Sequence, residues 1–476
     1  MMPPSPQHIA FDLGASSGRV LLGTLDGGRM HLDDVHRFET PLIEAGKRLY
    51  WDLEALDEQL AIGLEQGMAA AAHLQSLSVD AWGVDYVPLG EDGHPLRNPH
   101  CYRDPRTHAV MEAALKRVSR TEIYATTGIQ FIPINTLYQV LADQQMEPER
   151  VARTTQRLMM ADYVHYRFCG RAVAEQSMAS TTQLMNVRTQ TWATDLMERF
   201  DINPSTWPEI VPPATTLGPL IRNGTATDID VIAGCSHDTA CAVAAVPAES
   251  DGLPWAYISC GTWSLLGVER TDPVLTDAAR EASFTNEIGL DGTVRFLKNL
   301  TGLWVLQECE RAWAADGQTF DYDLLQREAE AADPMEPVNL DDPRFVERGR
   351  MPQKLQAYCR EHDQPVPTSR GAFVRLVLES LAADYREKLA VLEDVIDTRI
   401  EKVHLVGGGA QNELLCQWTA DATGRRVIAG PAEATALGNL LIQARVMGTL
   451  PDGATIRDVV RASTDLRVYD PAESPG

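Results

Sequence analysis

Basic residues are scarce in this sequence. Its 476 residues include 42 Lys and Arg against 67 Asp and Glu, so the formal net charge is −25 with neutral histidines. A field of that sign repels nucleic acids and anionic membrane surfaces, which excludes both as expected partners. A phosphorylated ligand would bind only where backbone N–H groups, helix N-termini and a metal ion overcome this field locally. Mg²⁺ dependence is therefore expected of any such site.

Signals for zinc sites, membranes and one large class of nucleotide enzymes are also missing. The eight cysteines form no Cys-x-x-Cys pair and do not combine with His at zinc-ligand spacing, so we expect reduced thiols in a cytoplasmic protein. The chain starts without a basic region followed by an apolar stretch, and no window approaches the roughly 18 apolar residues of a membrane span. Gly-x-x-x-x-Gly-Lys-[Ser/Thr] occurs nowhere, which argues against a P-loop enzyme.

The sequence does contain enough apolar residues for two hydrophobic cores. With 476 residues and 44% hydrophobic content, it exceeds what one core normally organises, so two α/β domains of roughly 200 residues or more are expected. Pro, Ser, Asp and Gly gather between Val246 and Pro254 and predict a linker there. We therefore place the domains at residues 7–244 and 255–470.

The first domain is predicted to open with three antiparallel strands. Asp26-Gly-Gly-Arg29 is typical of a tight hairpin turn, and Asp52 is a candidate N-cap for the apolar residues that follow it at helical spacing. The predicted order is strand, strand, strand, helix and strand, over residues 9–12, 20–25, 31–38, 53–71 and 77–82.

A short sequence match predicts that the second half opens with a similar pair of strands. Strands are predicted over residues 255–259 and 264–269, and Leu265-Leu-Gly267 matches Leu21-Leu-Gly23 after the first loop. The repeat predicts two related domains, each opening with a hairpin that faces phosphate, with ligand held between them. Further elements expected here are helices over residues 373–392, 411–422 and 434–447 and a strand over residues 402–406.

Four short segments place small or acidic residues where strands are expected to end. Glycine lets backbone N–H groups approach phosphate oxygens, hydroxyls add donors, and aspartates hold Mg²⁺ or accept a proton. Each segment alone is also typical of an ordinary turn, and a glycine triplet also suits tight strand–helix packing. Together they predict a site for phosphoryl transfer; they are Asp12–Gly18, Ser236–Thr239, Cys260–Trp263 and Gly407–Gly409.

Asp238 is the candidate general base. It precedes a run of small apolar residues and is predicted to lie at a helix N-terminus, where it also suits a purely structural N-cap. A helix N-terminus favours the charged carboxylate, so we expect the pKa of Asp238 to stay low and the group to remain ionised.

The segment Asp80–Asp85 ends another predicted strand. Trp82 is more typical of a hydrophobic core than of a sugar platform, while Gly83 and the neighbouring aspartate suit hydrogen bonding to a polyol. The sequence leaves both interpretations open.

With these segments in place, the chain resembles the FGGY carbohydrate kinases over nearly its whole length. The resemblance rests on eight stretches, several of them specific to one subgroup: Asp12–Arg19, Asp80–Tyr86, Tyr102–Thr107, Gly128–Phe131 with Asn135–Gln139, Ser236–Thr239, Ser259–Ser264, Lys298–Trp304 and Val406–Gly409. It implies two ribonuclease-H-like domains of the actin and hexokinase type with a nucleotide cleft between them. It also implies transfer of the ATP γ-phosphoryl group to the 1-hydroxyl of L-rhamnulose.

The resemblance implies a role for each matching residue. Asp238 would be the proton acceptor, and Asp12 would hold Mg²⁺ through water. The nucleotide would contact Ala15, Ser16, Ser17, Gly18, Arg19, Thr262, Gln307, Gly408 and Gly409. The sugar would contact Gly83, His237, Asp238, Thr239 and Asn299. Cys260 stands where we expect Ser, and its place beside a phosphate loop suggests sensitivity to oxidation.

Three alternatives remain at this point. The first is a kinase for another ketose, such as L-fuculose or L-xylulose, since sugar pockets differ by few contacts. The second is a non-catalytic regulator that responds to sugar or nucleotide, although such proteins tend to lose the aspartates retained here. The third is an actin-like or chaperone-like ATPase, in which Trp82, His237 and Asn299 would have no purpose. The sequence does not determine the oligomeric state.

Overall fold

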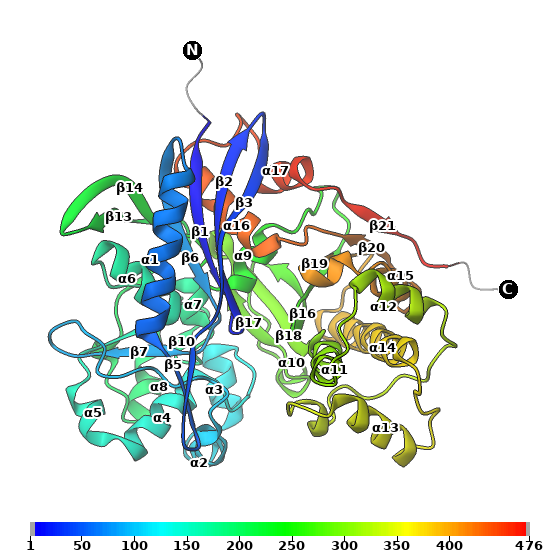
Figure 1. The fold of residues 1–476 in the computed structure, drawn as a ribbon. Helices are drawn as coiled ribbons and strands as arrows, with labels where there is room; N and C mark the ends of the chain where they lie inside the picture. Colours follow the sequence, from blue (N-terminus) through cyan, green and yellow to red (C-terminus); the bar gives the residue numbers. More distant parts are fainter. Residues whose placement is uncertain (1–4, 473–476) are drawn as a thin grey trace. The chain divides into compact units, whose positions relative to one another are not determined.

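The computed structural model describes residues 5–472, which form two compact units (Figure 1). Of the described residues, the first unit comprises 5–245, Glu269–Phe296 and Ala434–Ser463, and the second comprises Val246–Val268, Leu297–Glu433 and 464–472. The chain therefore returns to the first unit twice. Within residues 5–472, no helix combines the length and apolar character needed to cross a bilayer.

A six-stranded mixed sheet forms the centre of the first unit. Its order is β13-β14-β6-β1-β2-β3, with β1 parallel to β6 and antiparallel to β2. The predicted turn at Asp26–Arg29 is confirmed, because Gly27 and Gly28 adopt φ values of 54° and 80° that glycine tolerates without strain. The strands are β1 (Gln7–Leu13), β2 (Ser17–Asp26), β3 (Arg29–Glu39), β6 (Leu74–Ala81), β13 (Thr215–Arg222) and β14 (Thr225–Ala233).

Helix α1 (Leu53–Ala70) packs on this sheet and confirms the helix predicted after Asp52 (Figure 1). The Asp52 side chain accepts a hydrogen bond from Ala55 N at 3.2 Å, which satisfies one N–H of the first turn. Gly63 lies so close to Val20 of β2 that a Cβ there would collide with it. The helix thus presents an apolar stripe and a small residue to the sheet.

Helix α16 (Ala434–Val446), near the C-terminus of the chain, also belongs to the first unit. Gln443 Nε2 donates to Ile9 O on β1 at 2.9 Å, and Gln443 Oε1 accepts from Ser76 Oγ on β6 at 2.7 Å. One turn earlier, Asn439 Nδ2 donates to Asp80 Oδ2 at 2.6 Å. These buried polar groups join α16 to two central strands, so a late segment completes the first unit.

The second unit repeats the sheet of the first. The strands of this second sheet follow the order β17-β18-β16-β15-β19-β20-β21, in which β15 is antiparallel to β16 and parallel to β19. The first three residues of β18 and all of β17 are assigned to the first unit. The last pair is again antiparallel, as in the first sheet. The predicted repeat of the opening hairpin is therefore confirmed. The strands are β15 (Trp255–Cys260), β16 (Trp263–Arg270), β18 (Val294–Thr301), β19 (Lys402–Val406), β20 (Arg426–Ala429) and β21 (Arg467–Tyr469).

The helices predicted for the second half are present, with one boundary corrected. The long helix α14 (Arg370–Ile396) contains the predicted segment, whereas α15 (Glu413–Thr423) begins two residues later than expected. Gln411 lies in a 3₁₀ turn, and the Asn412 side chain caps α15 by accepting from Leu415 N at 2.9 Å. A local polar cap, not the apolar pattern, sets the start of this helix.

Most of the remaining elements lie between residues 42 and 245, in the connections that link or follow the strands of the first sheet. They are β4 (Leu42–Ala45), β5 (Arg48–Trp51), β7 (Tyr86–Leu89), α2 (His108–Arg117), α3 (Arg120–Thr127), α4 (Thr136–Met146), α5 (Pro148–Arg153), β8 (Gln156–Met159), α6 (Met160–Cys169), β9 (Ala174–Glu175), α7 (Gln176–Ser180), β10 (Met185–Asn186), β11 (Thr191–Trp192), α8 (Thr194–Arg199), β12 (Ile210–Val211), α9 (Asp238–Ala244), α10 (Asp277–Glu281), β17 (Thr285–Ile288), α11 (Trp304–Ala315), α12 (Tyr322–Glu330), α13 (Met351–Glu361) and α17 (Ile456–Ser463).

Candidate active site

Three aspartates meet where the central strands of the first sheet end. Asp12 on β1 is the register partner of Asp80 on the parallel strand β6. One residue further on, Ala81 pairs with His237, and Ala81 N donates to Ser236 O at 2.9 Å. Because parallel strands end at the same edge, this pairing brings the start of α9, and with it Asp238, to the same place. The sheet topology thus builds the acidic site.

Asp12 is paired with a residue of its own hairpin. Arg19 faces it across the β1–β2 pair, and Arg19 Nη2 lies 2.5 Å from Asp12 Oδ2. Between them the loop exposes Ser16 and Ser17, while Ala15 is partly exposed. The loop therefore presents hydroxyl and backbone donors beside a carboxylate, as a site for a phosphate and its metal requires.

Gly18, which sequence analysis assigned to the nucleotide, has a packing reason of its own. A Cβ at this position would collide with the ring of Phe38 on β3. The residue is buried, unlike the two serines before it. Its identity is therefore explained within the sheet, whether or not a ligand contacts its backbone.

Asp238 is the first residue of α9, and its pKa contradicts the sequence-based expectation. Burial and the negative charge of Asp12 raise the pKa of Asp238 to about 7, although hydrogen bonds from Thr239 N (2.5 Å) and Thr239 Oγ1 (3.0 Å) oppose the rise. The expectation of a low pKa was wrong because the helix terminus is a weaker influence than burial beside a second carboxylate. A base of this strength is well matched to neutral pH.

His237 lies beside Asp238 and faces a space that a glycine keeps free. Its Nε2 lies 3.5 Å from Asp238 Oδ1, and a Cβ at Gly83 would lie 3.2 Å from the same nitrogen. Burial, and then the charge of Arg295, lower the pKa of His237 well below its ordinary value, so the imidazole is neutral. Gly83 and His237, both predicted to contact sugar, are therefore neighbours.

The residue after Gly83 is strained. Val84 has a φ of 67°, a region that a β-branched residue rarely adopts. Its N donates to Thr181 Oγ1 at 3.2 Å, and its O accepts from Thr136 Oγ1 at 2.6 Å. Side chains from two other segments thus hold the backbone in this conformation, which fixes the position of Gly83 against His237.

Trp82 belongs to the core. It is 5% exposed, its ring centroid lies 4.4 Å from that of Trp51, and its Nε1 donates to Asp85 Oδ2 at 3.0 Å. Asp85 also accepts from Trp51 Nε1 at 2.6 Å and from Gln139 Nε2 at 2.7 Å. Buried hydrogen bonds therefore occupy Asp85, and the structure argues against its use as a polyol contact.

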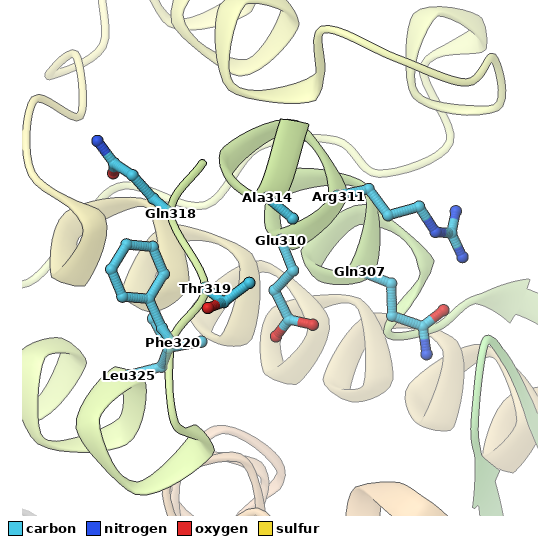
Figure 2. Close-up of a pocket in the computed structure, with 8 residues that line it drawn as sticks. All are labelled: Gln307, Glu310, Arg311, Ala314, Gln318, Thr319, Phe320 and Leu325. Atoms are coloured by element: carbon cyan, nitrogen blue, oxygen red, sulfur yellow. The ribbon is translucent and has the colours of Figure 1, made fainter. Parts of the chain in front are cut away.

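Two of the predicted nucleotide contacts meet in the second unit. Thr262 Oγ1 donates to Gln307 Oε1 at 3.2 Å. Gln307 also borders a cavity of about 370 Å³, where Figure 2 shows it on the same helix as Glu310 and Arg311. Phe320 adds an apolar ring to this lining. The cavity combines a flat apolar surface with hydrogen-bonding side chains, a combination suited to a small ligand.

Packing explains two glycines of the triplet but not the third. A Cβ at Gly407 or Gly409 would collide with Cys260, whereas nothing lies within 4 Å of a Cβ at Gly408. Gly408 is exposed. Gln411, just beyond the triplet, borders a second cavity of about 770 Å³. Close packing explains why two of these positions are glycine, whereas Gly408 has no such packing reason.

Cys260 itself is fully buried, and burial raises the pKa of its thiol. A buried, protonated thiol reacts slowly with oxidants, so the structure argues against the predicted oxidation sensitivity. The remaining predicted sugar contact, Asn299, lies on β18 in the second unit and is partly exposed.

Sequence reasoning missed four residues around the acidic site. Asp80 is fully buried, and burial together with the charge of Asp12 raises its pKa well above the ordinary value. Its position at the end of a predicted strand, level with Asp12, was the available signal. Asn439, Arg295 and Glu287 come from segments that reach the first unit only through tertiary structure, so no local motif marks them.

The acidic site suits a divalent cation whose remaining ligands are water and phosphate oxygens. Among residues 5–472, no group of three or more His, Cys, Asp and Glu side chains is arranged to hold a metal ion by itself. Mg²⁺ is usually held by one or two carboxylates together with water and phosphate oxygens. Asp12 raises the pKa of both Asp80 and Asp238, and a cation at Asp12 would relieve this repulsion.

Comparison with known proteins gives one consistent family. Models of the FGGY family of carbohydrate kinases match residues 8–245 (N-terminal domain) and 256–447 (C-terminal domain). The chain is 40% identical over 470 residues to a rhamnulokinase from Bacteroides thetaiotaomicron, covering 98% of this chain and 96% of the relative. It is 38% identical over 472 residues to a rhamnulokinase from Bacillus subtilis, with 98% and 96% covered.

Solved structures agree on the fold. A xylulose kinase from Lactobacillus acidophilus matches with a TM-score of 0.80 at 17% identity, covering 98% of this chain and 94% of that one. A glycerol kinase from Plasmodium falciparum, determined with ADP, matches with a TM-score of 0.78 at 15% identity over the same shares. The predicted two-domain α/β fold is confirmed.

Proposed function

Because this chain belongs to the FGGY family of carbohydrate kinases, we propose that it transfers the γ-phosphoryl group of ATP to the 1-hydroxyl of L-rhamnulose. The products are L-rhamnulose 1-phosphate and ADP, and the reaction serves L-rhamnose catabolism. The observation that carries this proposal is the placement of Asp238, with a pKa of about 7, beside His237 and the space kept by Gly83.

In the proposed mechanism, Asp238 removes the proton of the attacking sugar hydroxyl. Its carboxyl is 30% exposed and accepts hydrogen bonds from Thr239, which orient it without blocking its approach to a ligand. Gly83, His237, Thr239 and Asn299 are the proposed sugar contacts. Exclusion of water around the bound sugar would limit hydrolysis of ATP.

The proposed nucleotide contacts come from three loops or turns and one helix. They are Ala15, Ser16, Ser17, Gly18 and Arg19 in the first unit and Thr262, Gln307, Gly408 and Gly409 in the second. Asp12 is proposed to hold Mg²⁺ through water, and the cation offsets charge on the phosphates when it is bound. The hydrogen bond between Thr262 and Gln307, the cavity beside Gln307 and the open backbone at Gly408 support these assignments.

A coupled ADP-release assay tests the substrate. The expected result is the highest kcat/KM with L-rhamnulose among L-rhamnulose, L-fuculose, L-xylulose, D-xylulose and glycerol. A higher value with another ketose would assign the enzyme to that sugar instead. ADP release that no sugar stimulates would favour the regulator or ATPase alternatives.

Replacing Asp12 tests the metal assignment. In Asp12→Ala, the Mg²⁺ concentration for half-maximal rate is expected to rise roughly tenfold or more, the size of effect seen when outer-shell partners of a metal are removed. Asp26→Ala, at the turn between β2 and β3, is the matched control and should titrate like the parent. A Mg²⁺ titration of Asp12→Ala that superimposes on the parent curve would contradict the assignment.

The remaining properties follow as proposals. We propose 7–244 and 255–470 as the sequence limits of the two family domains. We propose a cytoplasmic enzyme, because all eight cysteines are free and seven are buried, as reduced thiols in that compartment would be. The net charge of −25 supports the absence of nucleic acid and anionic membrane partners.

A further inference from the structure

A buried arginine lies behind His237, on the side away from Asp238. Arg295 on β18 is fully buried, and its Nη2 lies 3.2 Å from His237 Nδ1. The same Nη2 lies 3.1 Å from Glu287 Oε2, and Arg295 Nε donates to Ile288 O at 3.2 Å. Glu287 Oε2 lies 3.5 Å from His237 Nδ1, farther than the guanidinium. All of these residues belong to the first unit. Three interactions therefore fix the guanidinium against one nitrogen of the imidazole.

This arrangement decides which imidazole nitrogen carries the proton. A guanidinium can only donate hydrogen bonds, so His237 Nδ1 must accept from Arg295. The carboxylate of Glu287 pairs with the charge of Arg295 and holds the guanidinium at this place. Because burial and Arg295 keep His237 neutral, the ring has one N–H, and that N–H is on Nε2.

The protonated nitrogen faces the proposed sugar space. Nε2 lies 3.5 Å from Asp238 Oδ1 and 3.2 Å from where a Cβ of Gly83 would stand. The N–H is thus beside the proposed base, at a place where a side chain on Gly83 would crowd it. An oxygen bound there would receive a hydrogen bond from a group that cannot act as an acceptor.

We propose that Arg295 and Glu287 are positioning residues that hold His237 as the Nε2–H tautomer, which then donates a hydrogen bond to a sugar oxygen next to the hydroxyl deprotonated by Asp238. The ligand in this statement rests on the proposed function. The consequence is a preference for sugars that present an acceptor oxygen at that position, since an unpaired buried N–H is costly.

The tautomer can be read without any sugar. In protein labelled with ¹⁵N-histidine, the His237 signals, assigned by their loss in His237→Gln, should show an unprotonated Nδ1 and a protonated Nε2. Arg295→Met leaves Glu287 facing Nδ1 and should move the proton to Nδ1. Arg295→Lys retains a donor at this place and should retain the tautomer of the parent.

Kinetics supply the second readout. Arg295→Met should lower kcat/KM for L-rhamnulose about 10- to 100-fold, the size expected from losing a hydrogen bond in a buried charged site, with KM for ATP unchanged. Arg295→Lys should lose clearly less. Arg457→Met, which removes an arginine paired with Glu269 in the same unit, is the control and should keep the tautomer and kcat/KM of the parent.

Two outcomes would overturn the proposal: a proton on Nδ1 in the parent, or Arg295→Met with the kinetics of the parent. If Arg295→Met fails to fold, the spectrum of the parent still decides it, because the proposal requires the proton on Nε2. Inactivity of the parent on L-rhamnulose would instead contradict the proposed substrate, because the tautomer is measured in the free protein.

Discussion

Replacing Asp238 with Asn is expected to lower kcat by about 10²- to 10⁴-fold, the range typical for loss of a general base. Asn keeps an oxygen that can accept from Thr239 N and Thr239 Oγ1, so the start of α9 should remain in place. KM for ATP should stay near that of the parent. The measurement is a steady-state titration of each substrate, with Asp228→Asn, an exposed aspartate on β14, as the control. Unchanged turnover in Asp238→Asn would contradict the assigned role.

The pH profile gives an independent check on the same residue. The pKa of Asp238 is raised to about 7, and only the deprotonated form accepts a proton. The kcat/KM of the parent should therefore fall as the pH drops below about 7, by about tenfold per unit at the acid end. This acid limb should disappear from the residual activity of Asp238→Asn. An acid limb that persists there would assign the titration to another group.

The loss of activity should come without a loss of stability. The native state holds the Asp238 proton up to about pH 7, whereas the ordinary pKa is 3.8, so its contribution to stability falls as the pH rises between these values. The Asn variant removes this effect. At pH 8 its melting temperature should equal or exceed that of the parent, which separates a catalytic defect from unfolding.

Gly438→Ala is expected to have the largest effect on stability. Gly438 lies on α16 where it crosses α9, and a Cβ there would fall inside the contact distance of Cys241 O. Backbone atoms cannot rotate away as a flexible side chain can, so the two helices must separate. We expect the free energy of unfolding to fall by about 1–3 kcal/mol, the usual cost of an overpacked core. Denaturant unfolding of the variant and the parent measures this directly.

The same variant should also lose activity, because α9 begins with Asp238. A shift of α9 moves the carboxylate relative to Asp12 and His237, and small displacements of a reacting group are costly. Gly408→Ala is the control for stability alone, since no atom lies within 4 Å of the added Cβ. If Gly438→Ala is as stable as Gly408→Ala, the helix contact is looser than the structure indicates.

Local patterns predicted the parts of the fold that depend on neighbouring residues. The turn at Asp26–Arg29 needs only two glycines, and the helix after Asp52 needs only a cap and an apolar stripe. The positions of Asp12 and Asp238 at strand and helix ends could be predicted for the same reason. The family resemblance then supplied their proposed roles, which spacing alone could not.

The remaining features depend on contacts between distant segments. The pKa of Asp238 could not be judged from its helix position, because Asp12 approaches it only through the sheet. Arg295 and Glu287 reach the site from a short segment that rejoins the first unit. From sequence alone, Gly438 is a residue that weakens its helix. Its packing role is apparent only from the close contact with the backbone of α9.

Because α16 packs on the first sheet, the first unit can be completed only late in translation. When a ribosome has released the first 245 residues, Asp80 still lacks Asn439, and Ser76 and Ile9 still lack Gln443. These partners are translated almost 200 residues later, in the segment Ala434–Ser463. All six strands of the first sheet are then present, but the polar groups that α16 pairs are not, so we expect a chain truncated before residue 434 to leave the first unit incomplete.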